Sequence, residues 1–223
     1  DHYDFTFADQ LPLRRGETVA YTIELTLDGV TNRIRGTVDN LTFTHTKRVV
    51  LEEMTGTTCG NCPQGILAIS QMERLYGNRF IPVSIHTYTG DIWGNGLDGY
   101  TTYLGLYGAP TAVIQRSTDA CMPMTTDESF RFTFSHNGEL WMDRVAVEME
   151  KATPLAVSAK VNYNETTREF TMPVEVTSAL NIKNMKVNVF AVLLEDSLVN
   201  LQHNYFSNNP DPLLGDWGRG GKY

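Results

Sequence analysis

The chain has 223 residues and a formal net charge of −8; 41% of its residues are hydrophobic and 20% are charged. This composition is typical of a folded protein, and the length fits one large domain or two ordinary ones. The basic residues form no run longer than two, as at Arg14–Arg15, which argues against nucleic acid as a partner. No apolar stretch approaches the ~20 residues of a transmembrane helix.

Residues 1–46 are predicted to be rich in β-structure. Apolar residues alternate from Val19 to Leu27, the turn residues Asp28–Gly29 follow, and a second run extends from Arg33 to Phe43. Such alternation on both sides of a turn is typical of paired strands. We expect these strands to join either of the domains that follow.

Residues 47–153 mix strand and helix signals, with two cysteines between the first strand and the first helix. The buried strand is "RVVLEEM", residues 48–54, and the helix begins after Cys62 at Pro63 and ends at Gly77. Proline favours the first turn of a helix, and glycine favours the position just after its end. Further elements are expected as strands at 80–86, after Pro110 and at 130–134, and as helices at 97–106 and 139–152.

Residues 154–223 return to alternation, in the runs 155–163, 170–176 and 187–193. Three or more such strands can form a small sandwich. We therefore predict an immunoglobulin-like β domain here, and an α+β class for the whole chain. The final residues, from 207 on, are rich in Asn, Pro and Gly and are expected to form a loop.

The pair Cys59 and Cys62 is the main chemical signal. Unpaired amides and the macrodipole at a helix N-terminus favour a thiolate, which can lower the pKa of an exposed first cysteine to ~3.5–7.5. Cys59 would then attack a partner's disulfide, and the more shielded Cys62 would resolve the mixed disulfide. A purely structural disulfide is the weakest interpretation, since the loop that a Cys59–Cys62 bond closes is too short to add much stability.

Two other interpretations of the pair stay open. A zinc site needs two more ligands, for which Cys121 and one of the five histidines are the candidates. We favour no metal and no cofactor, because the chain has no second C-x-x-C. The remaining alternative is an inert disulfide on a binding scaffold.

Some nearby residues have ordinary structural interpretations. His86, at a strand end, is interpreted as a hydrogen-bonded residue rather than an acid–base partner. Cys121 is interpreted as a half-buried, unreactive thiol, and Trp93 and Trp141 as core or rim aromatics.

The middle block resembles the thioredoxin superfamily in the strand leading to "TCGNCP", the helix after it and the "GAPT" turn before a later strand. The resemblance implies that Pro110 is a cis proline facing the disulfide, that Ala109 tunes the redox pair, and that Pro110 and Thr111 present a substrate chain. It also implies that Glu53 is a buried acid that moves protons for the second cysteine. The chain departs from the thioredoxin pattern at Thr58, where thioredoxins carry an aromatic residue, and in the Gly-Asn pair between the cysteines.

More narrowly, "VLEEMTGTTCGNCPQG" with "PVSIH" and "GAPT" is similar to the Omp28-related outer-membrane proteins of Bacteroidetes. That resemblance implies a lipoprotein of the periplasm or outer membrane, with an N-terminal lipid anchor lost from a chain that starts at Asp1. Two functions follow as hypotheses. One is a cell-envelope thiol–disulfide oxidoreductase acting on protein thiols and disulfides. The other is a non-catalytic binding or assembly lipoprotein that retains a thioredoxin-like scaffold.

Overall fold

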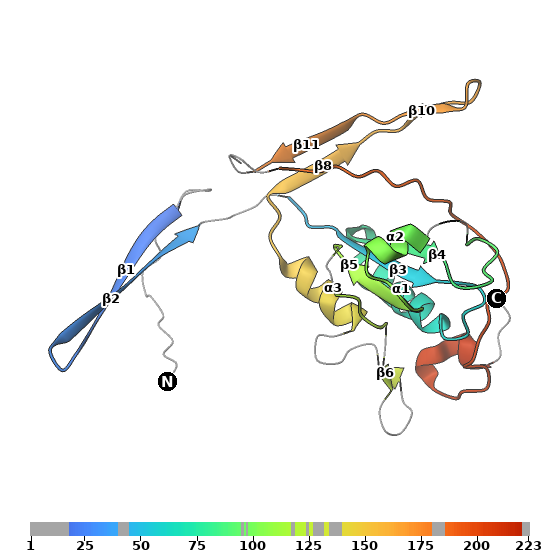
Figure 1. Ribbon diagram of the computed structural model, residues 1–223, viewed down its shortest axis with the longest axis horizontal. Coiled ribbons are helices and arrows are strands. Elements are labelled where there is room, and N and C mark those ends of the chain that lie inside the picture. The colour runs from blue at the N-terminus through green and yellow to red at the C-terminus, as the bar shows by residue number, and fades with distance from the viewer. Residues whose placement is uncertain are drawn as a thin grey trace. The chain divides into compact units, whose positions relative to one another are not determined.

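The computed structural model describes residues 18–39, 45–94, 96, 98–116, 119–123, 125–126, 132–133, 140–179 and 186–219. Its contacts divide the chain into two units: residues 1–46 with 152–187, and residues 47–151 with 188–223. The sequence had suggested one C-terminal region from 154 to 223, whereas residues 188–223 group with the middle block. Helices and a mixed sheet occur together (Figure 1), which confirms the α+β class.

The second unit is built on a three-stranded sheet with the order β4–β3–β5. The central strand β3 (Val49–Thr55) pairs in parallel with β4 (Phe80–His86) and antiparallel with β5 (Thr111–Ile114). In the register, Glu53 lies beside Ser84 of β4 and Ala112 of β5. The carboxyl end of β3 leads directly into the cysteine loop.

Helix α1 (Pro63–Tyr76) has the boundaries that its sequence predicts. Proline occupies its first turn, and Gly77 ends it at φ 53°, a left-handed backbone conformation that glycine adopts readily. The other helices of this unit are the 3₁₀ turn η1 (Gly77–Arg79), α2 (Asp98–Tyr103), α3 (Trp141–Glu150) and the 3₁₀ segment η2 (Pro212–Arg219). No helix among the described residues is long and apolar enough to cross a membrane.

Both faces of the sheet are covered. Helices α1, α3 and η2 pack on one face, where the fully buried residues include Leu51, Met72, Trp141 and Leu214. A smaller cluster of Ile85, Leu104, Leu106 and Val113 covers the other face. Neighbouring residues of a strand point to opposite faces, so Glu52 and Glu53 are buried on opposite sides of β3, at 2% and 1% exposure.

The first unit contains antiparallel hairpins. Strand β1 (Thr18–Leu27) pairs with β2 (Val30–Asp39) through a turn in which Asp28 and Gly29 both have positive φ, as a type I′ turn requires. Strand β8 (Leu155–Ala159) pairs with β11 (Val174–Ser178), and β9 (Asn162–Asn164) with β10 (Glu169–Thr171). The predicted run at 187–193 is described without a strand assignment, so the immunoglobulin-like sandwich stays a prediction.

A last, short pair is formed by β6 (Thr125–Thr126) and β7 (Phe132–Thr133). The strand expected at 130–134 lies only partly within the described residues. The N-terminal run expected to reach residue 43 also extends beyond them.

Candidate redox site at the start of helix α1

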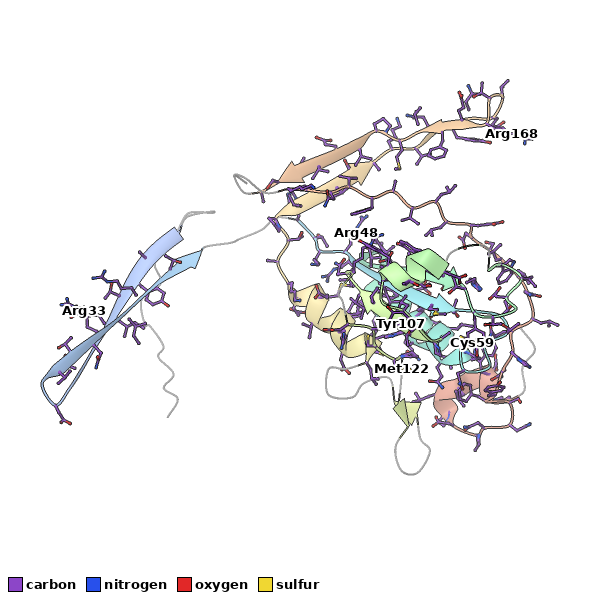
Figure 2. The ribbon with its side chains drawn as sticks, viewed as in Figure 1. Arg33, Arg48, Cys59, Tyr107, Met122 and Arg168 are labelled. Atoms are coloured by element: carbon purple, nitrogen blue, oxygen red, sulfur yellow. A yellow bond between two sulfur atoms is a disulfide. The ribbon has the colours of Figure 1, made fainter. Side chains whose placement is uncertain are left out.

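Cys59 and Cys62 form a disulfide at the amino end of α1, with their Cα atoms 5.4 Å apart. The loop before the helix is a tight turn, in which Cys59 N–H donates to the Gly56 carbonyl and Cys62 N–H to the Cys59 carbonyl. Figure 2 shows the labelled Cys59 in the described part of the second unit. The expectation of an exposed Cys59 is wrong for this form, because Cys59 is 2% exposed and Cys62 is fully buried.

The loop that precedes β5 approaches the disulfide, as the resemblance implies. The Ala109–Pro110 peptide bond is cis, and the Ala109 carbonyl oxygen lies 3.6 Å from Cys59 Sγ. A disulfide sulfur carries no hydrogen, so this is a contact that can become an S–H···O hydrogen bond once the pair is reduced. Pro110 is buried and Thr111 is half-buried, with its hydroxyl donating to the Gly108 carbonyl.

Glu53 lies on the face of β3 that α1 covers, with its carboxyl group against Gly65 of that helix. The Ser84 hydroxyl donates to its Oε1 at 2.7 Å, while its buried Oε2 has no hydrogen-bond partner among the described residues. A Cβ at Gly65 would lie 2.6 Å from that Oε2, so glycine is what allows the carboxyl group to approach the helix this closely. Gly65 N–H in turn donates to the Cys62 carbonyl.

Burial raises the pKa of the Glu53 carboxyl to about 7, and the hydrogen bond from Ser84 offsets part of this rise. The group therefore changes protonation near neutral pH. A buried carboxyl with such a pKa and an unpartnered oxygen is suited to moving a proton.

Its neighbour Glu52 has the opposite character. Arg116 donates to both of its carboxylate oxygens at 3.1 Å, and the Tyr100 hydroxyl donates to Oε1 at 2.5 Å. The Arg116 guanidinium also lies 4.6 Å from the centroid of the Phe190 ring. Glu52 is thus a structural carboxylate with a cationic partner. Glu53 has a hydrogen bond from Ser84 to one oxygen and none to the other among the described residues.

Asp91 holds the cysteine loop from the β4 side. Its Oδ2 accepts hydrogen bonds from Thr57 N–H at 2.6 Å and contacts His86 Nδ1 at 2.8 Å, and its Oδ1 accepts from Trp93 N–H. Burial alone would raise the pKa of Asp91, but the hydrogen bonds to His86, Trp93 and Thr57 together outweigh it, so the pKa lies below its ordinary value. The hydrogen-bonded interpretation of His86 is confirmed.

Residues 202–205, which we call the C-terminal strap, hold the same loop from another direction. His203 N–H donates to the Thr57 carbonyl at 2.7 Å and Tyr205 N–H to the Gly60 carbonyl at 2.9 Å. The Gln202 side chain donates to the carbonyls of Gly56 and Cys59, at 3.1 and 2.8 Å. The strap therefore contacts the loop on which the cysteines lie.

Comparisons with known proteins add little to this geometry. HBP35 of Porphyromonas gingivalis, a solved structure, is similar at a TM-score of 0.33 and 20% identity, over 53% of this chain and 38% of that one. The chain thus spans well under half of HBP35. No protein-family model and no curated protein matches the chain.

The remaining residues singled out in the sequence, Cys121, Trp141 and Trp93, make packing and hydrogen-bond contacts. Cys121 is buried on a β-bridge with Ala112, its Sγ donates to the Ala112 carbonyl at 3.6 Å, and burial raises its pKa to about 11. Trp141 is a core residue whose Nε1 donates to the Cys121 carbonyl, and Trp93 packs edge-on against His86. Within the described ranges, no three His, Cys, Asp or Glu residues gather as metal ligands would.

Sequence reasoning missed Asp91 and the strap. Asp91 had a weak local signal, since an aspartate that caps its own turn two residues on is a common loop motif. Gln202 had none, because it lies 143 residues from the Cys59 carbonyl that it contacts.

Proposed function

We propose that this protein is a thiol–disulfide oxidoreductase in which Cys59 and Cys62 alternate between a disulfide and a dithiol. The observation that carries the proposal is the contact of Cys59 Sγ with the Ala109 carbonyl, next to the cis Pro110, in a unit where the buried, unpartnered Glu53 oxygen faces Gly65 of the helix that follows the cysteines. An inert disulfide requires neither group. Its substrates are protein thiols and disulfides.

In the reducing direction, the Cys59 thiolate attacks one sulfur of a substrate disulfide. A mixed disulfide forms and the other substrate sulfur leaves as a thiolate. Cys62 then loses its proton and attacks Cys59 Sγ, which releases the second substrate thiolate and regenerates the Cys59–Cys62 disulfide. The two electrons pass from the pair to the substrate, and the oxidising direction is the reverse.

The amino end of α1 stabilises the thiolate on Cys59, since the helix dipole favours negative charge there. Glu53 accepts the proton of Cys62 for the second attack, which a carboxyl group with a pKa near 7 does at neutral pH. Its free Oε2 faces Gly65, one helical turn after Cys62.

Ala109, Pro110 and Thr111 bind the extended chain of the substrate beside Cys59. The Ala109 carbonyl also lies where it accepts a hydrogen bond from a reduced Cys59.

We further propose a thioredoxin-like layout for residues 47–153, an Omp28-related family membership and a location in the periplasm or at the outer membrane. The order strand β3, C-x-x-C, α1, β4, cis proline and β5 supports the layout. The family and the location rest on the sequence resemblance alone, as does the immunoglobulin-like region.

A second candidate is a binding or assembly lipoprotein whose disulfide is never reduced. It is favoured by one observation, the 2% exposure of Cys59. The two candidates differ in whether removal of Cys59 abolishes thiol–disulfide exchange.

The test is insulin reduction with dithiothreitol as electron donor, comparing wild type, Cys59→Ser and the matched control Cys121→Ser. The proposal predicts that wild type and Cys121→Ser accelerate the reaction equally and that Cys59→Ser does not. Equal rates for wild type and Cys59→Ser would leave the binding protein as the function.

A further inference from the structure

The C-terminal strap binds the cysteine loop through backbone hydrogen bonds. Its two backbone donors come from alternate residues, His203 and Tyr205, and reach the carbonyls of Thr57 and Gly60. The strap therefore uses backbone acceptors of the loop that an extended partner chain could otherwise use.

Three side chains of the strap add to this pairing, and one of them is His203, whose Nδ1 lies 3.2 Å from the Thr58 carbonyl oxygen. The Gln202 amide bridges the Gly56 and Cys59 carbonyls, on either side of the turn that carries Cys59. The Tyr205 ring lies against Gly60 so closely that a Cβ at residue 60 would be 2.5 Å from it. Gly60 is buried as a result, although it lies between the two cysteines.

The two ends of the strap are held differently. On its C-terminal side, the Asn204 amide donates to the Trp217 carbonyl of η2 at 2.9 Å, and Leu214 of η2 is fully buried in the core. On its N-terminal side, Val199 and Leu201 are 91% and 71% exposed. The strap is thus anchored at η2 and weakly packed upstream, an arrangement that lets it lift from the Gln202 end.

We propose that the strap gates the redox pair: it lies on the cysteine loop in the disulfide form, and a dithiol reaches Cys59 only after it lifts. This deepens the proposed function and rests on it for its biological meaning. In the gated step, a thiolate of the dithiol attacks Cys59 Sγ and the Cys59–Cys62 bond breaks, with Cys62 leaving as a thiolate. The second thiol of the dithiol then loses its proton and displaces Cys59, so the dithiol is oxidised and the pair is reduced.

The gate is tested by the rate at which dithiothreitol reduces the Cys59–Cys62 disulfide, followed by quenching and thiol labelling. The double variant Gln202→Ala/Tyr205→Ala removes the Gln202 hydrogen bonds and the Tyr205 ring contact. It should be reduced about tenfold faster than wild type, a factor equivalent to about 1.4 kcal/mol in the lifting equilibrium. Val199→Ala is the matched control, because Val199 lies just before the strap and is 91% exposed. Its rate should equal that of wild type.

A measurement on the wild-type protein keeps the proposal testable if the double variant folds poorly. The amide hydrogens of His203 and Tyr205 should exchange with solvent much more slowly than an unpaired amide in the oxidised protein, and faster after reduction. Unprotected amides at both positions in the oxidised protein, or a double variant that folds and is reduced within twofold of the wild-type rate, would overturn the gate.

Neither readout depends on enzymatic turnover. If wild type fails to reduce insulin but dithiothreitol reduces the double variant faster than wild type, the proposed function is refuted and the gate stands. If wild type reduces insulin through Cys59 but the strap variants are reduced at the wild-type rate, the gate is refuted and the proposed function stands.

Discussion

The buried carboxyl of Glu53 should make the protein less stable as the pH rises through neutrality. Burial raises its pKa from 4.5 to about 7 in the folded protein, while the unfolded chain keeps the ordinary value. The folded state therefore binds the proton more tightly. The contribution of Glu53 to stability is greatest below pH 4.5 and falls until the group is ionised in both states, above about pH 7. At 1.36 kcal/mol per pKa unit, the loss is about 3 kcal/mol.

The substitution Glu53→Gln removes this dependence, because a glutamine of the same shape carries no charge at any pH. We expect wild type to lose about 3 kcal/mol of unfolding free energy relative to Glu53→Gln between pH 4.5 and pH 8.5. Urea unfolding of both proteins at the two pH values measures it, and unchanged m-values confirm that the same transition is compared. Since every other titrating group is common to the two proteins, the difference between them isolates Glu53.

A variant of Ser84 sharpens this test. Ser84→Ala removes the hydrogen bond that offsets part of the rise, so its stability should fall over a window shifted to higher pH. A wild-type minus Glu53→Gln difference that is the same at pH 4.5 and pH 8.5 would refute the assignment of a raised pKa to Glu53, and with it the proton-transfer role.

Three other substitutions test the packing around the site. Arg116→Met leaves the buried Glu52 carboxylate without its charged partner and should cost about 3–5 kcal/mol in chemical unfolding; a loss below 1 kcal/mol would show that the pair is not needed. Gly65→Ala places a Cβ 2.6 Å from the carboxyl oxygen that faces α1 and should destabilise by about 1–3 kcal/mol. The control Gly99→Ala, in a helix with open space around it, should be neutral or stabilising by up to about 1 kcal/mol. The Gly65→Ala protein should therefore melt at a lower temperature than the Gly99→Ala protein, and the reverse order would contradict the close packing at Gly65. Asp91→Ala leaves a loop amide without its acceptor and should lower the unfolding free energy by about 1–3 kcal/mol, whereas no change in denaturation midpoint would remove Asp91 from the account.

The parts of the fold that depend on local patterns were predictable from the sequence. Helix α1 occurs where Pro63 and Gly77 place its ends, and the adjacent strand β3 occurs where the apolar run 48–54 predicts it. Alternation likewise located the paired strands β1 and β2. These features are set by residues within a few positions of one another.

The parts that depend on distant contacts were not predictable. The burial of Cys59 contradicts the exposed cysteine expected from the motif. Its sulfur contacts the Ala109 carbonyl, 50 residues away, and the strap that contacts its loop lies more than 140 residues away in the chain. The sequence singled out Glu53 over Glu52 only through the thioredoxin resemblance, since both lie on a strand covered on its two faces. Their surroundings separate their roles: Arg116 pairs with the Glu52 carboxylate, whereas Oε2 of Glu53 has no hydrogen-bond partner among the described residues.

The reduction potential of the Cys59–Cys62 pair tests the central claim most directly. Equilibration with a glutathione buffer of known ratio, followed by thiol labelling, gives the value, and Cys121→Ser serves as the background with no third thiol. A redox-active pair is expected between roughly −270 and −120 mV, the range of known disulfide oxidoreductases. A potential below roughly −300 mV, typical of structural disulfides, would contradict the account.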